Sequence, residues 1–248
     1  MPLVITGSVA IATSAVAGRA MFSPRSQLLG PVVFRADSNP DGRVGLTFDD
    51  GPDPRTTPRI LDILDEAGSR ATFFVIGVHA RRHPDLIRRI HERGHLLGNH
   101  SFHHHYTGMF RFQGYWRREL QRTDEVIADA TGCTPAWFRP PMGMRNIHLA
   151  RVLKRRGYCV VTWSRNARDG IDASVPGIVH RVGQRAKAGD IVLLHDGVDR
   201  PGREAKTATV AALPLLISRL RERGLSIEPL DDLIGVNAYR RPACGDLP

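Results

Sequence analysis

The chain has 248 residues, of which 42% are hydrophobic and 24% charged, and its formal net charge is +10. This length and composition fit one globular domain with a single large core and no internal repeats. The positive charge comes without zinc-finger spacing, an aromatic stacking motif or a basic tail, so nucleic acid is not an expected partner.

The first 18 residues carry no charge and are rich in Ala, Val and Ile. This pattern is typical of an export signal or a membrane-associated segment, the alternative being an N-terminal packing segment. The cell envelope or secretion is therefore the favoured location. If the segment spans a membrane, Arg19 and Arg25 favour the cytoplasmic side for the domain. Residues 19–42 follow as a connecting segment, 43–235 as the catalytic domain, and 236–248 as a C-terminal tail.

Strand-like and helix-like patterns alternate along residues 43–235. An apolar run covers 44–48, and later strands are predicted at 71–76, 137–138, 158–163, 190–194 and 225–227, with an apolar stretch at 96–98 leading into a histidine cluster. Helices are predicted at 56–68, 84–93, 115–130, 146–156, 175–188 and 206–223. Such alternation predicts a parallel sheet with right-handed crossovers. The count alone does not distinguish a closed barrel from an open sheet.

The positive charge lies mainly on these arginine-rich helices. Charge spread over many helices is typical of a solvated exterior. The alternative is attraction to an anionic surface, such as lipid head groups or a cell-wall polymer, so membrane or cell-wall association stays open. The three cysteines fit neither a disulfide framework nor a metal site.

Two adjacent carboxylates, Asp49 and Asp50, follow the first apolar run and precede the turn Gly51-Pro52. Side chains alternate along a strand, but at a strand end two consecutive acids can converge on one pocket. Strand ends are also where α/β enzymes place their chemistry. One carboxylate can hold a metal while its neighbour takes a proton from water. The alternative is a solvated Asp-Gly turn.

A histidine cluster supplies further candidate metal ligands. His100 and His104 are four residues apart, so a helical turn would set both imidazoles on one side. Together with one Asp, two His form a facial triad that leaves positions for water and substrate. His103 and His105 fall outside this pairing, which makes them spectators or supporting groups. The alternative is a polar loop of histidines without metal.

Three further polar signals stand at the exits of apolar segments. Arg139 lies in the stiff stretch Phe138–Gly143, Asp169 follows the strand predicted at 158–163, and His195 ends the apolar run 191–194. Each signal is weak alone, because an Arg-Pro-Pro is commonly a rigid turn and a strand-end His is commonly packed. Five such signals at strand exits together indicate one site.

The order of these motifs resembles the polysaccharide deacetylase family, the carbohydrate esterases related to the rhizobial chitooligosaccharide deacetylase. The resemblance spans about residues 43–235 and rests on Thr47-Phe48-Asp49-Asp50-Gly51-Pro52, His100-Ser101-x-x-His104, Arg139-Pro140-Pro141-x-Gly143, the Asp169 segment and Leu193-x-His195. The chain departs from the family at two places. Asn166, Asp169 and Gly170 stand where the family has two acids and a Trp, and Met142 stands where it often has Tyr. Gly170 is expected to change the packing of the pocket wall and to leave the chemistry intact.

The resemblance implies a fold and a cofactor. The fold is a distorted (β/α) barrel of about seven parallel strands, with its site at the C-terminal face of the strands. Asp50, His100 and His104 would hold one divalent metal. Zn²⁺ is the expected ion, and Co²⁺, Ni²⁺, Fe²⁺ or Mn²⁺ also suit these ligands.

The resemblance also implies roles for the remaining residues. Asp49 would be the general base, kept ionised by the metal and Arg139. His195 would be the general acid for the departing amine, with Asp169 raising its pKa. A backbone N–H near Met142 would hold the oxyanion. In the same reading, Leu193 would shape the pocket for the acetyl methyl group.

The expected activity is therefore hydrolysis of the amide C–N bond of N-acetyl groups on amino sugars. Expected substrates are peptidoglycan, a chitin-like oligomer or a lipid-linked glycan. Three alternatives remain: O-deacetylation of an acetylated polysaccharide, amide or imide hydrolysis on the same fold, and a catalytically dead carbohydrate-binding relative. The complete metal set disfavours the second, and the presence of Asp49 and His195 disfavours the third.

Overall fold

The computed structural model describes residues 21–36 and 41–240. The segment expected to direct export, residues 1–18, lies outside the described residues. In the described part of the chain, no helix combines the length and apolar character needed to cross a bilayer.

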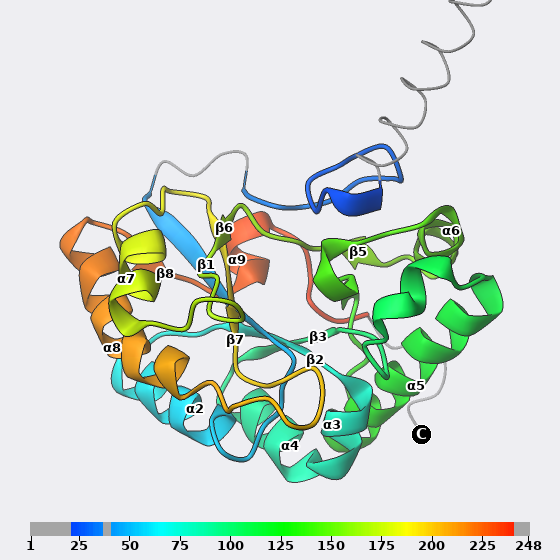
Figure 1. Ribbon diagram of the computed structural model, residues 1–248, viewed down its shortest axis with the longest axis horizontal. Helices are drawn as coiled ribbons and strands as arrows, with labels where there is room; N and C mark the ends of the chain where they lie inside the picture. The colour runs from blue at the N-terminus through cyan, green and yellow to red at the C-terminus, as the bar shows by residue number, and fades with distance from the viewer. Residues whose placement is uncertain (1–20, 37–40, 241–248) are drawn as a thin grey trace, which may run out of the picture.

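The core of the structure is a curved sheet in which every strand pairing is parallel (Figure 1). Its order is β5-β4-β3-β2-β1-β7-β6, and β8 pairs with the start of β1. The strands are β1 (Arg43–Asp49), β2 (Thr72–Val75), β3 (Leu96–Asn99), β4 (Trp137–Phe138), β5 (Cys159–Val160), β6 (Arg165–Asn166), β7 (Ile191–His195) and β8 (Ser226–Ile227). The predicted barrel of about seven parallel strands is confirmed as a half-barrel.

Most of the helices flank the outer face of this sheet, and α9 (Leu230–Ile234) lies at its inner side (Figure 1). The other helices are α2 (Thr57–Glu66), α3 (Gly77–Arg82), α4 (Pro84–Glu92), α5 (Gln113–Thr131), α6 (Ile147–Arg155), α7 (Val175–Gly183) and α8 (Thr207–Glu222), with short 3₁₀ turns at η1 (Tyr106–Phe110) and η2 (Pro141–Gly143). The long helices follow the predicted amphipathic segments. Sequence reasoning missed α3 and α9, because helices this short give too few turns for an apolar stripe.

Alternation along β1 separates the outer core from the barrel interior. Val44, Leu46 and Phe48 are buried in the large apolar cluster that includes residues of α2, α4, α7 and α8. The intervening residues face inward, where Gly45 is needed for close packing: a Cβ there would lie 2.4 Å from Leu230 of α9. Helix α9 thus closes the bottom of the barrel, and the opposite end, where the strands finish, is left for the site.

The strand predicted at 158–163 is only partly right. Regular pairing with β4 ends at Val160, and Val161 and Thr162 instead flank Val33 from the N-terminal segment. The Val33 N–H donates to the Val160 carbonyl at 2.9 Å, and the Thr162 N–H donates to the Val33 carbonyl at 2.8 Å. The chain then pairs with β7 through β6. This strand was not predicted, because its residues are polar and form no apolar pattern.

Candidate active site

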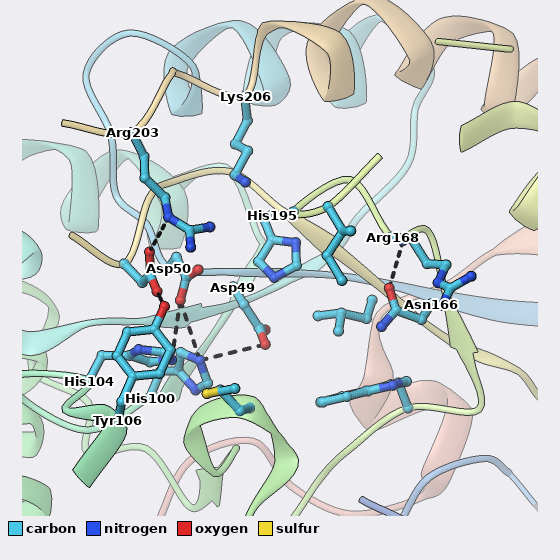
Figure 2. Close-up of a pocket in the computed structure, with 16 residues that line it drawn as sticks. Asp49, Asp50, His100, His104, Tyr106, Asn166, Arg168, His195, Arg203 and Lys206 are labelled. Atoms are coloured by element: carbon cyan, nitrogen blue, oxygen red, sulfur yellow. Dashed lines mark hydrogen bonds and ion pairs between the residues drawn. The ribbon is translucent and has the colours of Figure 1, made fainter. Parts of the chain in front are cut away.

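Strand register brings the predicted polar residues to one end of the barrel. Asp49, the last residue of β1, stands opposite His195, the last residue of β7. Asn99 at the end of β3 pairs with Phe138 of β4, so His100 and Arg139 leave neighbouring strands side by side. A cavity of about 350 Å³ opens at this end and is lined by Asp49, Asp50, His100, His104, Met142, Leu193 and His195, among others (Figure 2).

The two adjacent acids converge on this cavity because the backbone turns sharply at Asp50. Its φ of 73° lies in the left-handed region, which is unusual for a residue other than glycine. The His79 ring donates from Nδ1 to the Asp50 carbonyl at 2.9 Å and so supports the turn. As a result, both carboxylates line one cavity although strand neighbours normally face opposite sides.

Asp50, His100 and His104 bring three potential ligand atoms together. The Asp50 Oδ1 atom lies 3.6 Å from Nε2 of each histidine, and the three ligand atoms all lie within 4.8 Å of one another. This Oδ1 is buried and accepts no hydrogen bond from the described residues. Buried acceptors left in this way are costly unless a cation satisfies them. The donor set therefore fits a divalent metal.

The protonation of His100 suits a metal ligand. Its Nδ1–H donates to the Arg139 carbonyl at 2.7 Å, which leaves the lone pair of Nε2 directed at Asp50. Burial, with the nearby His104 as a smaller cause, holds the pKa of His100 well below its ordinary value. The imidazole is therefore neutral and can donate its lone pair to an ion.

The predicted helical turn from His100 to His104 is wrong. The two imidazole rings nevertheless lie together, with their centroids 4.9 Å apart. Ser101 and His104 both have positive φ, at 66° and 54°. The Asn99 side chain accepts from the Ser101 N–H at 2.9 Å, and the Ser101 hydroxyl accepts from the His104 N–H at 3.1 Å. These local side-chain bonds satisfy the backbone and so replace a helix with an irregular turn.

His103 and His105 stay outside the metal-facing group, as the spacing predicted. His103 instead lies against the buried Glu119 of α5, with its Nδ1 2.7 Å from Oε1. The other oxygen of Glu119 accepts from the N–H groups of Phe102 and His103. Glu119 thereby fixes the turn that carries the metal-facing histidines.

Asp49 is held by Arg139, which is fully buried in the barrel. Its Nη1 donates at 2.7 Å to both Asp49 Oδ1 and the Thr47 hydroxyl. Its remaining nitrogens donate to the carbonyls of Val161 and Thr162. Burial raises the pKa of Asp49 to about 6, although the Arg139 charge opposes this rise. Asp49 is therefore largely ionised near neutral pH.

His195 is paired with Asp169, as the family resemblance implied. The ring Nδ1 of His195 lies 2.7 Å from Asp169 Oδ1, and the backbone N–H of His195 donates to Asp169 Oδ2 at 2.8 Å. Burial disfavours the charged ring, but Asp169, with smaller contributions from Asp50 and Asp49, outweighs burial and raises the pKa of His195 to about 9. The ring is therefore protonated near neutral pH, with Nε2 as its free N–H.

The two residues expected to contact substrate also line the cavity. Leu193 is buried on β7 and pairs in register with Thr47. Met142 has φ of 56°, and its N–H donates no hydrogen bond within the described residues. Gly170, where the resemblance has Trp, borders the same cavity.

Sequence reasoning missed three supporting residues. Thr47 joins Arg139 to β7, because its hydroxyl donates to the Val192 carbonyl at 2.6 Å. Its inward position on β1 was a usable signal. Glu119 was readable as an acid on the buried face of a helix. Thr209 donates to Asp169 Oδ2 at 2.8 Å from α8, and no local pattern points to it.

Comparison with known proteins gives the same picture. The polysaccharide deacetylase family model matches residues 36–161. The chain is 35% identical to a peptidoglycan-N-acetylglucosamine deacetylase of Bacillus cereus, over 77% of this chain and 87% of that protein. It is 36% identical to a chitooligosaccharide deacetylase of Rhizobium leguminosarum, over 83% and 98%. A crystal structure of a peptidoglycan N-acetylglucosamine deacetylase superposes with a TM-score of 0.78 at 28% identity, covering 84% of this chain and 95% of that one. With the motifs in order on a matching half-barrel, this chain belongs to the polysaccharide deacetylase family.

Proposed function

We propose that this protein is a metal-dependent hydrolase that removes N-acetyl groups from the amino sugars of a polysaccharide or glycan. Candidate substrates are peptidoglycan, a chitin-like oligomer and a lipid-linked glycan, in line with the relatives named for the first two. The observation that carries the proposal is one cavity lined by a metal-facing triplet, an ionised carboxylate and a protonated histidine.

Deacetylases of this family depend on a metal, and Asp50, His100 and His104 would hold it here. A divalent ion at this position would polarise the acetamide carbonyl and acidify water. Two imidazoles and one carboxylate suit Zn²⁺ best, with Co²⁺, Ni²⁺, Fe²⁺ and Mn²⁺ as alternatives.

Asp49 would act as the general base that takes a proton from the attacking water. Its Oδ2 lies 3.7 Å from His100 Nε2, so the base is beside the metal-facing group without belonging to it. Arg139 occupies Oδ1 with a charge-assisted bond, which leaves the other oxygen to accept the proton. Burial brings the pKa of Asp49 to about 6, near the range in which a general base is effective.

His195 would act as the general acid that protonates the leaving nitrogen. Asp169 fixes the ring through Nδ1, so the proton to be donated is on Nε2. An amine leaves poorly without this proton, which makes a charged histidine at the cavity useful for amide hydrolysis.

Two further contacts would place the acetyl group. The unpaired N–H of Met142 would donate to the oxyanion, since a preorganised backbone donor is well suited to that charge. Leu193 would pack against the acetyl methyl group from β7.

An acetate-release assay tests the proposal. Chitooligosaccharides and peptidoglycan serve as N-acetyl substrates, and acetylated xylan serves as an O-acetyl substrate. We expect release from an N-acetyl substrate that stops with a chelator and returns with Zn²⁺. Activity that ignores the chelator, or release from the xylan alone, would contradict the proposal.

A further inference from the structure

We propose that Lys206 makes this site selective for an amino sugar that carries an anionic group, a carboxylate or a phosphate, close to its acetamido group. The inference rests on the proposed function and specifies further that the glycan substrate is negatively charged. It comes from an unpaired ammonium group at the cavity, on a largely buried side chain, that the catalytic proposal does not use.

Lys206 is a largely buried lysine whose ammonium has no partner among the described residues. The residue is only 9% exposed, yet its Nζ makes no hydrogen bond or ion pair with the described part of the chain. Lysine is rarely buried unless its charge is paired. The chain has only three lysines among its 35 basic residues, so one in this position is not part of a general surface charge. Its side chain lines the cavity and points toward His195 (Figure 2).

Gly170 leaves the space that exposes this ammonium to the cavity. A Cβ at Gly170 would lie 3.7 Å from His195 Cε1 and 3.9 Å from Lys206 Nζ. A large side chain here, such as the Trp of the family pattern, would stand between the ammonium and the general acid. The small residue at Gly170 and the unpaired ammonium of Lys206 therefore belong to the same part of the cavity wall.

The carboxylates of the site are already matched by other groups. The matches are Asp49 with Arg139, Asp169 with His195, Asp199 with Arg203, and Asp50 with the metal-facing histidines. None of the carboxylates that line this cavity is left to pair with Lys206. An anionic group of the substrate would neutralise the Lys206 ammonium.

Arg168 adds a second cation at the rim of the same cavity. Its side chain is exposed and makes no ion pair within the described residues. The Asn166 side chain holds this turn by accepting from the Arg168 N–H at 2.7 Å, with Arg168 at φ 58°. In Figure 2, Lys206 and Arg168 lie on the His195 side of the cavity, away from His100 and His104. The anionic group is thus expected on the leaving-amine side of the sugar.

Binding of three monosaccharides to the metal-loaded protein tests this inference. N-acetylglucosamine is neutral, N-acetylmuramic acid carries a carboxylate, and N-acetylglucosamine 6-phosphate carries a phosphate. NMR titration gives each Kd without requiring turnover. We expect at least one acidic sugar to bind about tenfold more tightly than the neutral one, and the better of the two identifies the anionic group.

Three variants assign the preference to Lys206. Lys206→Met should abolish it while leaving the Kd of N-acetylglucosamine within about twofold, and Lys206→Arg should keep most of it. Lys187→Met is the matched control, because Lys187 is exposed before β7 and does not line the cavity. Equal affinities in the wild type, or an equal loss for all three sugars in Lys206→Met, would overturn the inference. Neither result bears on acetate release from oligosaccharides, so failure of the proposed function would be seen separately.

Discussion

The site has two halves that differ in where the charge that balances their buried groups comes from. The metal-facing half, Asp50 with His100 and His104, brings together three potential ligand atoms, and the Asp50 Oδ1 among them accepts no hydrogen bond from the described residues. The proton-donating half, His195 with Asp169, contains its own counter-charge at 2.7 Å. The first half is complete only with a cation from outside, whereas the second is complete within the chain. Metal binding and proton donation should therefore be separable by mutation.

His100 and His195 illustrate this difference, because their pKa values shift in opposite directions. His100 gives its Nδ1–H to a backbone carbonyl, so burial dominates and its pKa lies well below the ordinary value. His195 gives the same atom to a carboxylate, and against the effect of burial its pKa rises to about 9. The partner of one ring nitrogen thus decides whether the other is a ligand or an acid.

The largest expected effect is loss of the metal-facing half. His104→Ala should lose both metal and turnover, with activity falling on the order of 10³-fold or more, because the Lewis acid itself is lost. Metal content by elemental analysis and acetate release check this. His105→Ala is the control, since this neighbouring histidine is exposed and outside the metal-facing group. Full metal content in His104→Ala would contradict the ligand assignment.

Removing the base should leave the metal in place. Asp49→Asn should lower kcat by about 10²- to 10⁴-fold, the usual contribution of a positioned base, while metal content stays at the wild-type level. The asparagine amide keeps the size of the side chain but cannot take a proton. Near-normal rates in this variant would show that another group is the base.

Asp169→Asn should damage only the proton-donating half. Without the carboxylate, burial lowers the pKa of His195, so the ring loses its proton at a lower pH. We expect the alkaline limb of the pH profile to move below about 9 and activity at neutral pH to fall about tenfold. Metal content should not change. An unmoved limb would mean that Asp169 does not control the acid.

The smallest effect is expected at Met142. Its side chain is 49% exposed, and only its backbone N–H is assigned a role. Met142→Ala should therefore change kcat/KM less than about tenfold, whereas loss of a true oxyanion donor costs about 10²-fold or more. Steady-state kinetics on chitooligosaccharides checks this, and a loss of the larger size would assign the function to the side chain.

Local patterns predicted most of the fold and the ends of its strands. The apolar run at 44–48 was readable as a strand because Val44, Leu46 and Phe48 are buried against the helices. Helix α3 and strand β6 were not, since both are short and depend on tertiary contacts. At the site, motif order pointed to the residues that meet, but the turn at His100–His104 depends on Asn99 and Ser101 side chains. Lys206 follows no motif and emerges only from burial and a missing partner.

The pH dependence of kcat/KM tests most directly that the two halves hold opposite protonation states. Asp49 must lose its proton and His195 must keep its own, so activity should fall on both sides of a bell. A bound cation lowers the pKa of both groups, so the acid limb should lie at or below about 6 and the alkaline limb at or below about 9. A rate that stays level through about pH 9 and beyond, or one that still rises there, would contradict a charged His195 as the acid.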